Sequence, residues 1–288
     1  MSATEFTVAC IQTDPEIGRV RENLDRQHEL IAEAVNHGAK LVVLPECSTS
    51  GYMFETRAEA VECSELLGEG PATTSWIRIA KEASLHLVAG IVERSGDVLY
   101  NSAVLIGPLG ILGVYRKVHL WEKEKEIYAF GDFGFPVVST PLGRIGMQIC
   151  YDAWFPESFR LPALQGADII CSASNWVPVP TQPDEDTAMA TLMCRTGAHS
   201  NVLYVAACSR VGTERGQRFI GRSVIVDHLG QPLAGPASGE REETVLALVD
   251  PIGNRDARRT NPFNHGLRDR RTDTYAEMLG SAHTAGEY

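Results

Sequence analysis

FTVACIQ at residues 6–12 and KLVVLPE at residues 40–46 are two apolar runs of strand length. Between them, apolar side chains recur three and four residues apart, which predicts a helix from about residue 20 to residue 36. Gly38 follows, at a position where a glycine commonly ends a helix. These residues predict a β-α-β unit, and because the second run is apolar on both faces we expect its strand to be buried.

The same alternation continues towards the C-terminus, but several neighbouring strands follow one another without a helix. The residues GPLG at 107–110 mark a hairpin between two of them. Hairpins within such an alternation favour two mixed sheets packed face to face with helices outside, and a plain doubly wound sheet is the structural alternative. No GxGxxG follows the first strand and no GxxxxGK(S/T) occurs, so dinucleotide-binding and P-loop folds lose their main support. The remaining predicted strands cover residues 86–94, 99–107, 110–120, 143–150, 167–174, 201–209, 222–227 and 244–250, and the remaining helices cover about 73–84, 156–166 and 186–199.

The chain has 288 residues, with 26 basic and 37 acidic side chains and a net charge of -11. An acidic chain without a basic stripe suits neither nucleic acid nor anionic lipid, so we expect neither as a partner. The seven cysteines are scattered and form no CxxC pair, which favours a reducing compartment over a disulfide framework or a zinc ribbon. The N-terminal residues do not read as a signal peptide, and no apolar run approaches the roughly 20 residues of a bilayer span, so we expect a cytoplasmic protein.

The domain organisation follows from the absence of any linker-like or low-complexity segment in the sequence. We predict a single domain over residues 1–253. Residues 254–288 are polar, rich in arginine and poor in core residues, so they have too little apolar content to fold alone. We expect them to form a C-terminal arm that packs on a partner subunit.

Three side chains that can carry chemistry end or close predicted core strands, namely Glu46, Lys117 and Cys150. Burial at the edge of an apolar core would raise the pKa of Glu46 towards a value useful for a general base, although a solvated loop glutamate is equally typical there. Lysine is uncommon in strands, but an outward lysine on an edge strand explains Lys117 better if it is considered alone. Cys150 lies between a buried strand and a helix, as in a nucleophile elbow, whereas the other six cysteines suit buried structural positions. Because strand ends converge at one edge of a sheet, the three together form a complete set for acyl transfer.

Three segments match the catalytic motifs of one enzyme superfamily in order and context, namely LPE with Glu46, YRKVHL with Lys117 and GMQICYDAWFPE with Cys150. The chain therefore resembles the nitrilase superfamily of carbon–nitrogen hydrolases. The resemblance runs from about residue 6 to residue 250. It implies an α/β fold, a four-layer α-β-β-α sandwich of two mixed sheets flanked by helices. It also implies that Glu124 is an accessory glutamate, that no metal or organic cofactor takes part, and that the chain forms a homodimer or a higher homo-oligomer.

The chemistry that the resemblance implies is hydrolysis of a small non-peptide amide to a carboxylic acid and ammonia through a thioester on Cys150. Glu46 acts as the base, and Lys117 and the backbone N–H of Tyr151 hold the oxyanion. Glu124 positions the substrate amide and keeps Glu46 and Lys117 aligned. The lysine favours the thiolate and the glutamate opposes it, so we expect the thiol and the carboxylate to share a proton.

The sequence leaves the substrate open. Nitrilases proper tend to carry Cys-Trp-Glu at the nucleophile, whereas Cys150-Tyr151-Asp152 looks like the amidase branches. The arginine pair of N-carbamoyl-D-amino-acid hydrolases is missing between residues 175 and 187. A nitrilase or an N-carbamoyl amidohydrolase stays the alternative, and a catalytically silent binding protein of the same fold is the alternative of a different class.

Candidate walls of the substrate pocket follow the catalytic segments or the next strand end, although aromatic side chains are also routine core residues. Asp184, Glu185 and Asp186 suit a cationic or neutral amide, but a solvated helix N-terminus explains them better. The candidate walls are Tyr52, Phe54, Trp121, Trp154, Asn175 and Trp176.

Two histidines raise the alternative of a Cys–His hydrolase, namely His119 and His199. No papain-like or caspase-like signature surrounds Cys150, which speaks against this alternative. His119 lies two residues after Lys117, and we expect it to have a structural role in hydrogen bonds near the site.

Overall fold

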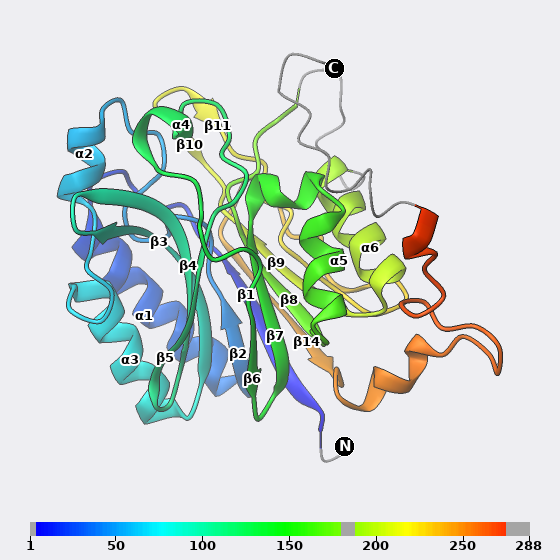
Figure 1. Ribbon diagram of the computed structural model, residues 1–288. Coiled ribbons are helices and arrows are strands. Elements are labelled where there is room, and N and C mark those ends of the chain that lie inside the picture. Colours follow the sequence, from blue (N-terminus) through cyan, green and yellow to red (C-terminus); the bar gives the residue numbers. More distant parts are fainter. Residues whose placement is uncertain (1–3, 180–187, 275–288) are drawn as a thin grey trace.

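Two six-stranded sheets form the centre of the structure, a computed structural model that describes residues 4–179 and 188–274 (Figure 1). In hydrogen-bonding order, the first sheet contains β14 (Glu243–Val249), β1 (Phe6–Gln12), β2 (Ala39–Val43), β3 (His86–Ser95), β4 (Val98–Gly107) and β5 (Gly110–Arg116). The second contains β13 (Pro232–Ala234), β12 (Val224–Val226), β9 (Tyr204–Ser209), β8 (Ile169–Ser174), β7 (Gly143–Ile149) and β6 (Val137–Thr140). In each sheet the three central strands are parallel, and the strands beside them, β14 and β4 in the first sheet and β12 and β6 in the second, run antiparallel to them. The edge strands β5 and β13 pair antiparallel with β4 and β12, so they run in the same direction as the central strands. This arrangement confirms the predicted pair of mixed sheets and excludes a plain doubly wound sheet.

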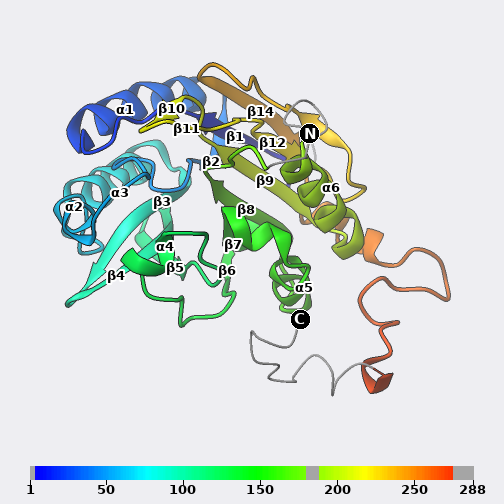
Figure 2. The same cartoon turned by 90° about the horizontal axis from the view of Figure 1, so that it is seen from above.

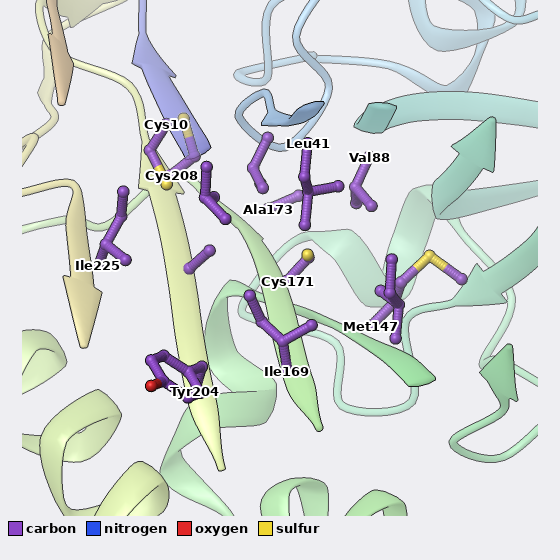
Figure 3. Close-up of a cluster of buried hydrophobic side chains, with 14 of the residues drawn as sticks. Cys10, Leu41, Val88, Met147, Ile169, Cys171, Ala173, Tyr204, Cys208 and Ile225 are labelled. Carbon is purple, nitrogen blue, oxygen red and sulfur yellow. The ribbon is translucent and has the colours of Figure 1, made fainter. Parts of the chain in front are cut away.

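The main hydrophobic core lies between the inner faces of the two sheets, and Figure 3 shows part of it. Because successive side chains of a strand point to opposite faces, Cys10 of β1 lies in this core while its neighbour Ile11 packs on the helix side. Cys171 and Cys208 lie in the same core as Cys10, among aliphatic side chains. All seven cysteines are free, and these three act as small apolar residues, as predicted.

Helices cover both outer faces of the pair of sheets and complete four layers (Figures 1 and 2). The apolar faces of two helices pack on the first sheet and those of two others pack on the second. The predicted α-β-β-α sandwich is therefore confirmed. Within residues 4–179 and 188–274, none of the helices combines the length and the apolar character that crossing a bilayer demands. The helices on the first sheet are α1 (Val20–Asn36) and α3 (Pro71–Ala83), and those on the second are α5 (Glu157–Leu164) and α6 (Met189–Asn201).

Short elements gather at one end of the sandwich, at the top of Figure 1. They are α2 (Arg57–Glu62), α4 (Glu124–Ile127) and the hairpin of β10 (Thr213–Glu214) and β11 (Gln217–Arg218). Beneath α2 and α4 lies a small apolar cluster that includes Cys47, Phe54, Leu120, Ile127 and Tyr128. This cluster covers the segments that leave β2 and β5, and it makes their surroundings more buried than the edge of an open sheet.

Several element boundaries differ from the sequence-based prediction, and three of the differences lie near the candidate site. The strand β5 ends at Arg116 instead of continuing to residue 120, and the following polar segment contains the short helix α4. A 3-10 helix, η1 (Cys150–Trp154), follows β7 directly and precedes α5. The helix α6 begins at Met189, whereas its predicted start and the acidic residues 184–186 lie outside the described residues.

The first part of the predicted C-terminal arm packs on its own chain. A 3-10 helix, η2 (Gly253–Arg258), places Arg255 against the buried carboxylate of Asp168, with nitrogen–oxygen distances of 2.8 and 2.6 Å. Asn254 donates a hydrogen bond of 2.6 Å to Tyr204 Oη. Most of residues 259–274 are exposed. Packing of this arm on a partner subunit stays a prediction.

Candidate active site

Glu46, Lys117 and Cys150 all follow the C-terminal ends of strands. Glu46 lies three residues beyond the end of β2, and Lys117 directly follows β5. Two reversals of direction, from β3 to β4 and from β4 to β5, bring the end of β5 to the same edge of the first sheet as the end of β2. Cys150 directly follows β7 in the second sheet. The site therefore takes its groups from both sheets.

The ammonium group of Lys117 lies between two carboxylates. Its Nζ donates to Glu46 Oε1 at 2.7 Å and to Glu124 Oε1 at 2.7 Å. Asn101, in the middle of β4, donates from Nδ2 to the same two oxygens at 2.7 and 3.0 Å. All four side chains are buried, so water contributes little to the solvation of these charges. Glu46 is more deeply buried than we predicted, because the segments after β2 and β5 are covered.

The two glutamates differ in how many donors they meet. Glu124 Oε1 accepts from Lys117, Asn101 and Tyr52 Oη, the last at 2.8 Å, and Glu124 Oε2 accepts from the backbone N–H of Trp121 at 2.7 Å. Four donors are a full set for an ionised carboxylate. Glu46 Oε2, in contrast, is buried and has no hydrogen-bond partner among the described residues. Glu46 thus has a free oxygen for chemistry, whereas both oxygens of Glu124 are occupied by donors.

The pKa values of Glu46 and Lys117 follow from this burial. Burial raises the pKa of Glu46 to about 7, and Glu124 adds to the rise while Lys117 and the hydrogen bond from Asn101 oppose it. Burial alone would lower the pKa of Lys117, but Glu124 and Glu46 outweigh it and hold that pKa well above its usual range. At neutral pH the lysine is therefore a cation beside a carboxyl group that is close to its own midpoint.

Cys150 lies at a sharp turn from strand to helix. Its φ of +47° is the left-handed conformation, which costs a non-glycine residue about 1 kcal/mol or more, and η1 starts there. This is the predicted elbow geometry. Burial raises the pKa of the Cys150 thiol well above its usual range; Glu46 adds to the rise, and Lys117 and the backbone N–H of Asn175 oppose it. The thiol therefore keeps its proton where Glu46 has lost its own, and a proton shared between the two groups stays a prediction.

Tyr52 and Trp121, two of the predicted pocket walls, both bind Glu124 and line one cavity together with Phe54. The ring of Tyr151 packs edge-on against Trp121, with centroids 4.7 Å apart. Because Tyr151 follows Cys150, this contact joins the nucleophile turn to the cavity wall. These positions agree with a place beside the substrate, and substrate contact by these side chains stays a proposal.

Asn175, Trp176 and Trp154 lie on the side of the second sheet. Asn175 donates from Nδ2 to the backbone carbonyl of Glu46 at 3.0 Å, and its buried Oδ1 has no partner in the described part of the chain. Trp176 is 2% exposed and packs in the core beneath α5 and α6, against which Cys150 also lies. Trp154 lines a groove between α5 and α6. The two tryptophans are thus core or groove residues here, and their role as pocket walls remains a proposal.

Among the described residues, neither His119 nor His199 contacts Cys150, so the structure gives no support to a Cys–His pair. His119 stacks on Phe155 with centroids 3.7 Å apart, and its Nδ1 lies 2.8 Å from Asp152 Oδ1. This is the structural role expected of His119. The Nδ1 of His199 lies 3.1 Å from the carbonyl oxygen of Leu229, on the exposed side of α6. Across residues 4–179 and 188–274, no group of His, Cys, Asp and Glu side chains is arranged to hold a metal ion.

Sequence reasoning missed the residues that hold this network together. Asn101 lies inside the predicted strand LYNSAVLIG, where its only signal was an amide within an apolar run. Asp152 was read as a marker of the substrate class, but it is fully buried and bonded within the protein. A polar residue in the interior of a buried strand needs a partner, and this rule was the signal available for Asn101.

Comparisons with known proteins agree with the fold and identify the family. A sequence model of the family described as carbon-nitrogen hydrolase matches residues 7–259. A nitrilase of Pyrococcus abyssi is 41% identical over 268 residues, which cover 93% of this chain and 98% of the relative. Omega-amidase NIT2 of Homo sapiens is 31% identical over 291 residues, which cover 95% of this chain and 98% of the relative. The crystal structure of a carbon-nitrogen hydrolase from Helicobacter pylori G27 has a TM-score of 0.81 and 28% identity and covers 96% of this chain and 99% of its own.

Proposed function

The chain belongs to the carbon–nitrogen hydrolase family of enzymes, and from this premise we propose that it hydrolyses a small non-peptide amide to a carboxylic acid and ammonia through a thioester on Cys150. One observation carries the proposal. Glu46 Oε2 is the one carboxylate oxygen of the Glu46–Glu124 pair that lacks a donor within the described residues. The charge of Glu46 is among the causes that raise the pKa of the Cys150 thiol, after burial. A base with a pKa of about 7 beside a thiol is suited to start acyl transfer at neutral pH.

The first half of the reaction acylates the enzyme. Glu46 takes the proton of Cys150 as the sulfur attacks the carbonyl carbon, and the carbonyl oxygen becomes an oxyanion. Lys117 Nζ and the backbone N–H of Tyr151 stabilise this oxyanion. Glu46 then gives its proton to the nitrogen, the carbon–nitrogen bond breaks, and ammonia leaves a thioester behind. Loss of one oxyanion donor is expected to slow this step by about 100-fold or more.

The second half returns the enzyme to its starting state. Water replaces ammonia, Glu46 takes a proton from it, and the resulting hydroxide attacks the thioester. The carbon–sulfur bond breaks, the proton returns to the sulfur, and the carboxylic acid leaves. Glu124 keeps Lys117 and Asn101 in place throughout. Its oxygens are already occupied by four donors, so we assign it this positioning role rather than contact with the substrate amide.

Two buried acceptors support an amide over a nitrile. Glu46 Oε2 and Asn175 Oδ1 have no partner among the described residues, and Asn175 is held by the backbone of Glu46. The amide orientation of Asn175 is unambiguous, because only an NH₂ group can donate to that carbonyl. A primary amide brings two N–H donors for two acceptors, whereas a nitrile brings none and leaves both acceptors buried and unpaired. An N-carbamoyl group also ends in NH₂, so it is the second candidate substrate.

The test compares substrates that share a carbon skeleton. Purified protein is incubated with a short aliphatic amide, the matching nitrile and the matching N-carbamoyl amine, and ammonia release is measured. We expect the amide to be the best of the three, Cys150→Ala to abolish release, and intact mass to show an acyl adduct on the wild type. Cys63→Ala, at a half-buried cysteine of the α2 segment, is the matched control and should keep full activity.

Several outcomes would contradict the proposal. Full activity of Cys150→Ala would exclude the thioester, and absence of release from every substrate by a folded wild-type protein would favour the silent binding protein. Faster hydrolysis of the nitrile than of the amide would overturn the argument from the two acceptors. Replacement of Asn175 by Leu also removes its bond to the backbone of Glu46, so both rates should fall, but kcat/KM for the amide should fall by roughly threefold to tenfold more than that for the nitrile, as one lost substrate hydrogen bond predicts.

We also propose that the protein acts as a homodimer in the cytoplasm. Leu161 and Leu164 on the outer face of α5 are 45% and 44% exposed, beside the groove that Trp154 lines between α5 and α6. Burial of such a face against a second copy would remove apolar surface from water. Sedimentation velocity is the test, with a dimer expected for the wild type and a monomer for the double variant Leu161→Asp and Leu164→Asp. An unchanged sedimentation coefficient would rule out this face.

A further inference from the structure

The reacting groups lie on two sheets that share no backbone hydrogen-bond ladder. Glu46 and Lys117 follow strands of the first sheet, and Cys150 follows a strand of the second. Within the first sheet, the continuous ladder from β2 to β5 sets where Glu46 lies relative to Lys117. Between the sheets, only side chains and loops can set the position of Cys150. Catalysis depends on this position, since a displacement of about 1 Å can cost roughly 100-fold in rate.

One tie across the sheets holds the Glu46 side. Asn175, at the end of β8, donates to the backbone carbonyl of Glu46 at 3.0 Å, and the backbone N–H of Glu46 donates to the carbonyl of Ser174 at 3.4 Å. These bonds hold the segment that carries the base. They make no contact with the segment that carries Lys117.

The second tie is the carboxylate of Asp152, which is fully buried in η1. Its Oδ2 accepts from the backbone N–H of Ile149 at 2.9 Å and from Tyr115 Oη at 2.6 Å. Its Oδ1 accepts from the backbone N–H of His119 at 3.0 Å and faces His119 Nδ1 at 2.8 Å. Tyr115 Oη in turn accepts from the backbone N–H of Val118 at 3.2 Å.

These partners are the sequence neighbours of the reacting groups. Ile149 directly precedes Cys150, and Val118 directly follows Lys117. We propose that Asp152 is a positioning residue, whose carboxylate joins the turn that carries Cys150 to the segment that carries Lys117 and so sets the distance between nucleophile and cation. The inference rests on the proposed function, because it gives the Cys150–Lys117 distance a role in the reaction.

The same bonds bear on the use of Asp152 as an indicator of the substrate class. Four donors from the protein occupy its two oxygens, which leaves no oxygen for a substrate. An acidic side chain at this position therefore serves the architecture of the site. The dipeptide Tyr151-Asp152 then gives no physical reason to prefer an amide over a nitrile, and that preference depends on Asn175 and Glu46.

The experiment compares Asp152→Asn with Asp168→Asn. Asp168 is an equally buried carboxylate that accepts from the backbone N–H of Arg144 and from Arg255, and it lies at the opposite edge of the same sheet, where β7 and β8 begin. An amide at position 152 accepts at only one of the two oxygen positions, so either the bonds that Ile149 and Tyr115 donate to Oδ2 or those that His119 makes with Oδ1 are lost. We expect Asp152→Asn to lower kcat by roughly 30-fold or more with KM changed by less than about threefold, and Asp168→Asn to lower stability while kcat stays within about threefold.

A second readout does not depend on the substrate. The rate at which iodoacetamide alkylates Cys150, followed by peptide mass, reports how well the site activates the thiol. We expect this rate at neutral pH to fall by about tenfold in Asp152→Asn and to stay within about threefold of wild type in Asp168→Asn. If the wild type alkylates rapidly but hydrolyses no amide, the proposed function fails while the positioning role is still measured.

Tyr115→Phe covers the case in which Asp152→Asn does not fold. It keeps the ring, which stacks on Phe135 with centroids 5.6 Å apart, and removes only the oxygen between Asp152 and Val118. We expect a fall of roughly fivefold or more in both kcat and alkylation rate, again with KM nearly unchanged. Values of kcat and alkylation rate for Asp152→Asn or Tyr115→Phe that match those of Asp168→Asn, at equal folded fraction, would overturn the proposal.

Discussion

Replacement of Asn101 by Leu tests the buried hydrogen-bond network of Lys117, Glu46 and Glu124, in which the role of Asn101 was not predicted from the sequence. Leucine has a similar size and shape but no donor. The change removes the hydrogen bonds of 2.7 and 3.0 Å to Glu46 and Glu124 and the partner of the Cys47 thiol, while Lys117 stays in place. Hydrogen bonds to charged groups contribute about 1.5–3 kcal/mol each, and here both acceptors are buried.

The loss of stability should depend on pH in a way that identifies Glu46. Below its pKa of about 7, Glu46 is protonated, so mainly the bond to Glu124 counts and the free energy of unfolding falls by about 1.5–3 kcal/mol. Loss of the Asn101 donor raises the pKa of Glu46 further. Because the pKa of Glu46 is higher in the folded than in the unfolded state, the protein loses stability as the pH rises up to the folded-state pKa. In the variant this pKa is higher still, so the loss continues to a higher pH and is larger. Between about pH 6 and pH 8 the deficit should grow by about 1 kcal/mol, since one pH unit above the wild-type pKa corresponds to about 1.4 kcal/mol.

The assay is urea unfolding of wild type and Asn101→Leu at the two pH values, with the m-value checked for constancy. Asn201→Leu is the matched control: Asn201 is also buried, but it donates to the carbonyl of Gly197 and to Ser200 Oγ and touches no carboxylate. Its deficit should be the same at both pH values. A deficit of Asn101→Leu that is equally independent of pH would refute the assignment of the pKa of Glu46 to this network.

Three further predictions follow from the same contacts. The value of kcat/KM for an amide should rise with pH through a midpoint near 7, because Glu46 must lose its proton to act as base. Glu46→Gln should abolish activity, and with it this rise with pH. A midpoint below about 5 in the pH–rate profile would contradict the raised pKa of Glu46. Glu124→Gln removes one of the two carboxylates that hold Lys117. The free energy of unfolding should fall by about 3–5 kcal/mol and kcat by roughly 100-fold or more. A fall in stability with kcat unchanged would exclude a positioning role. Arg255→Ala leaves Asp168 without its bidentate partner and should lower the free energy of unfolding by about 1–2 kcal/mol. This is less than the loss expected for a fully buried pair, because Arg255 is partly exposed. We expect kcat to stay unchanged, and a large loss of kcat would show that this end of the sheet affects the site.

The strand-end residues were predictable because they follow from local pattern. Glu46 and Cys150 each stand where an apolar run stops, and the sequence shows this without any long-range information. Lys117 lies within a run predicted to continue to residue 120, and the structure ends that strand one residue before it. The same holds for the β-α-β unit at the N-terminus, where side-chain periodicity sets the boundaries of β1 and α1 as the structure has them. The resemblance to a known superfamily then supplied the pairing of the two sheets, which periodicity alone left open.

Only the tertiary structure decided how these groups are held. Asn101 and Tyr115 lie in strands whose pattern predicts core side chains, and their polar atoms meet partners that are distant in the sequence: Glu46 is 55 residues from Asn101, and Asp152 is 37 residues from Tyr115. No local rule predicts such contacts, because they depend on which faces of two sheets meet.

Burial was underestimated for a related reason. Glu46 reads as a residue at the edge of a sheet, but the covering segments around α2 and α4 come from other parts of the chain, and they raise its pKa to about 7. The sequence by itself thus determined which groups carry the chemistry. The packing of one sheet on the other decided the charge state of the base and the position of the thiol, since both depend on side chains that meet only in the folded protein.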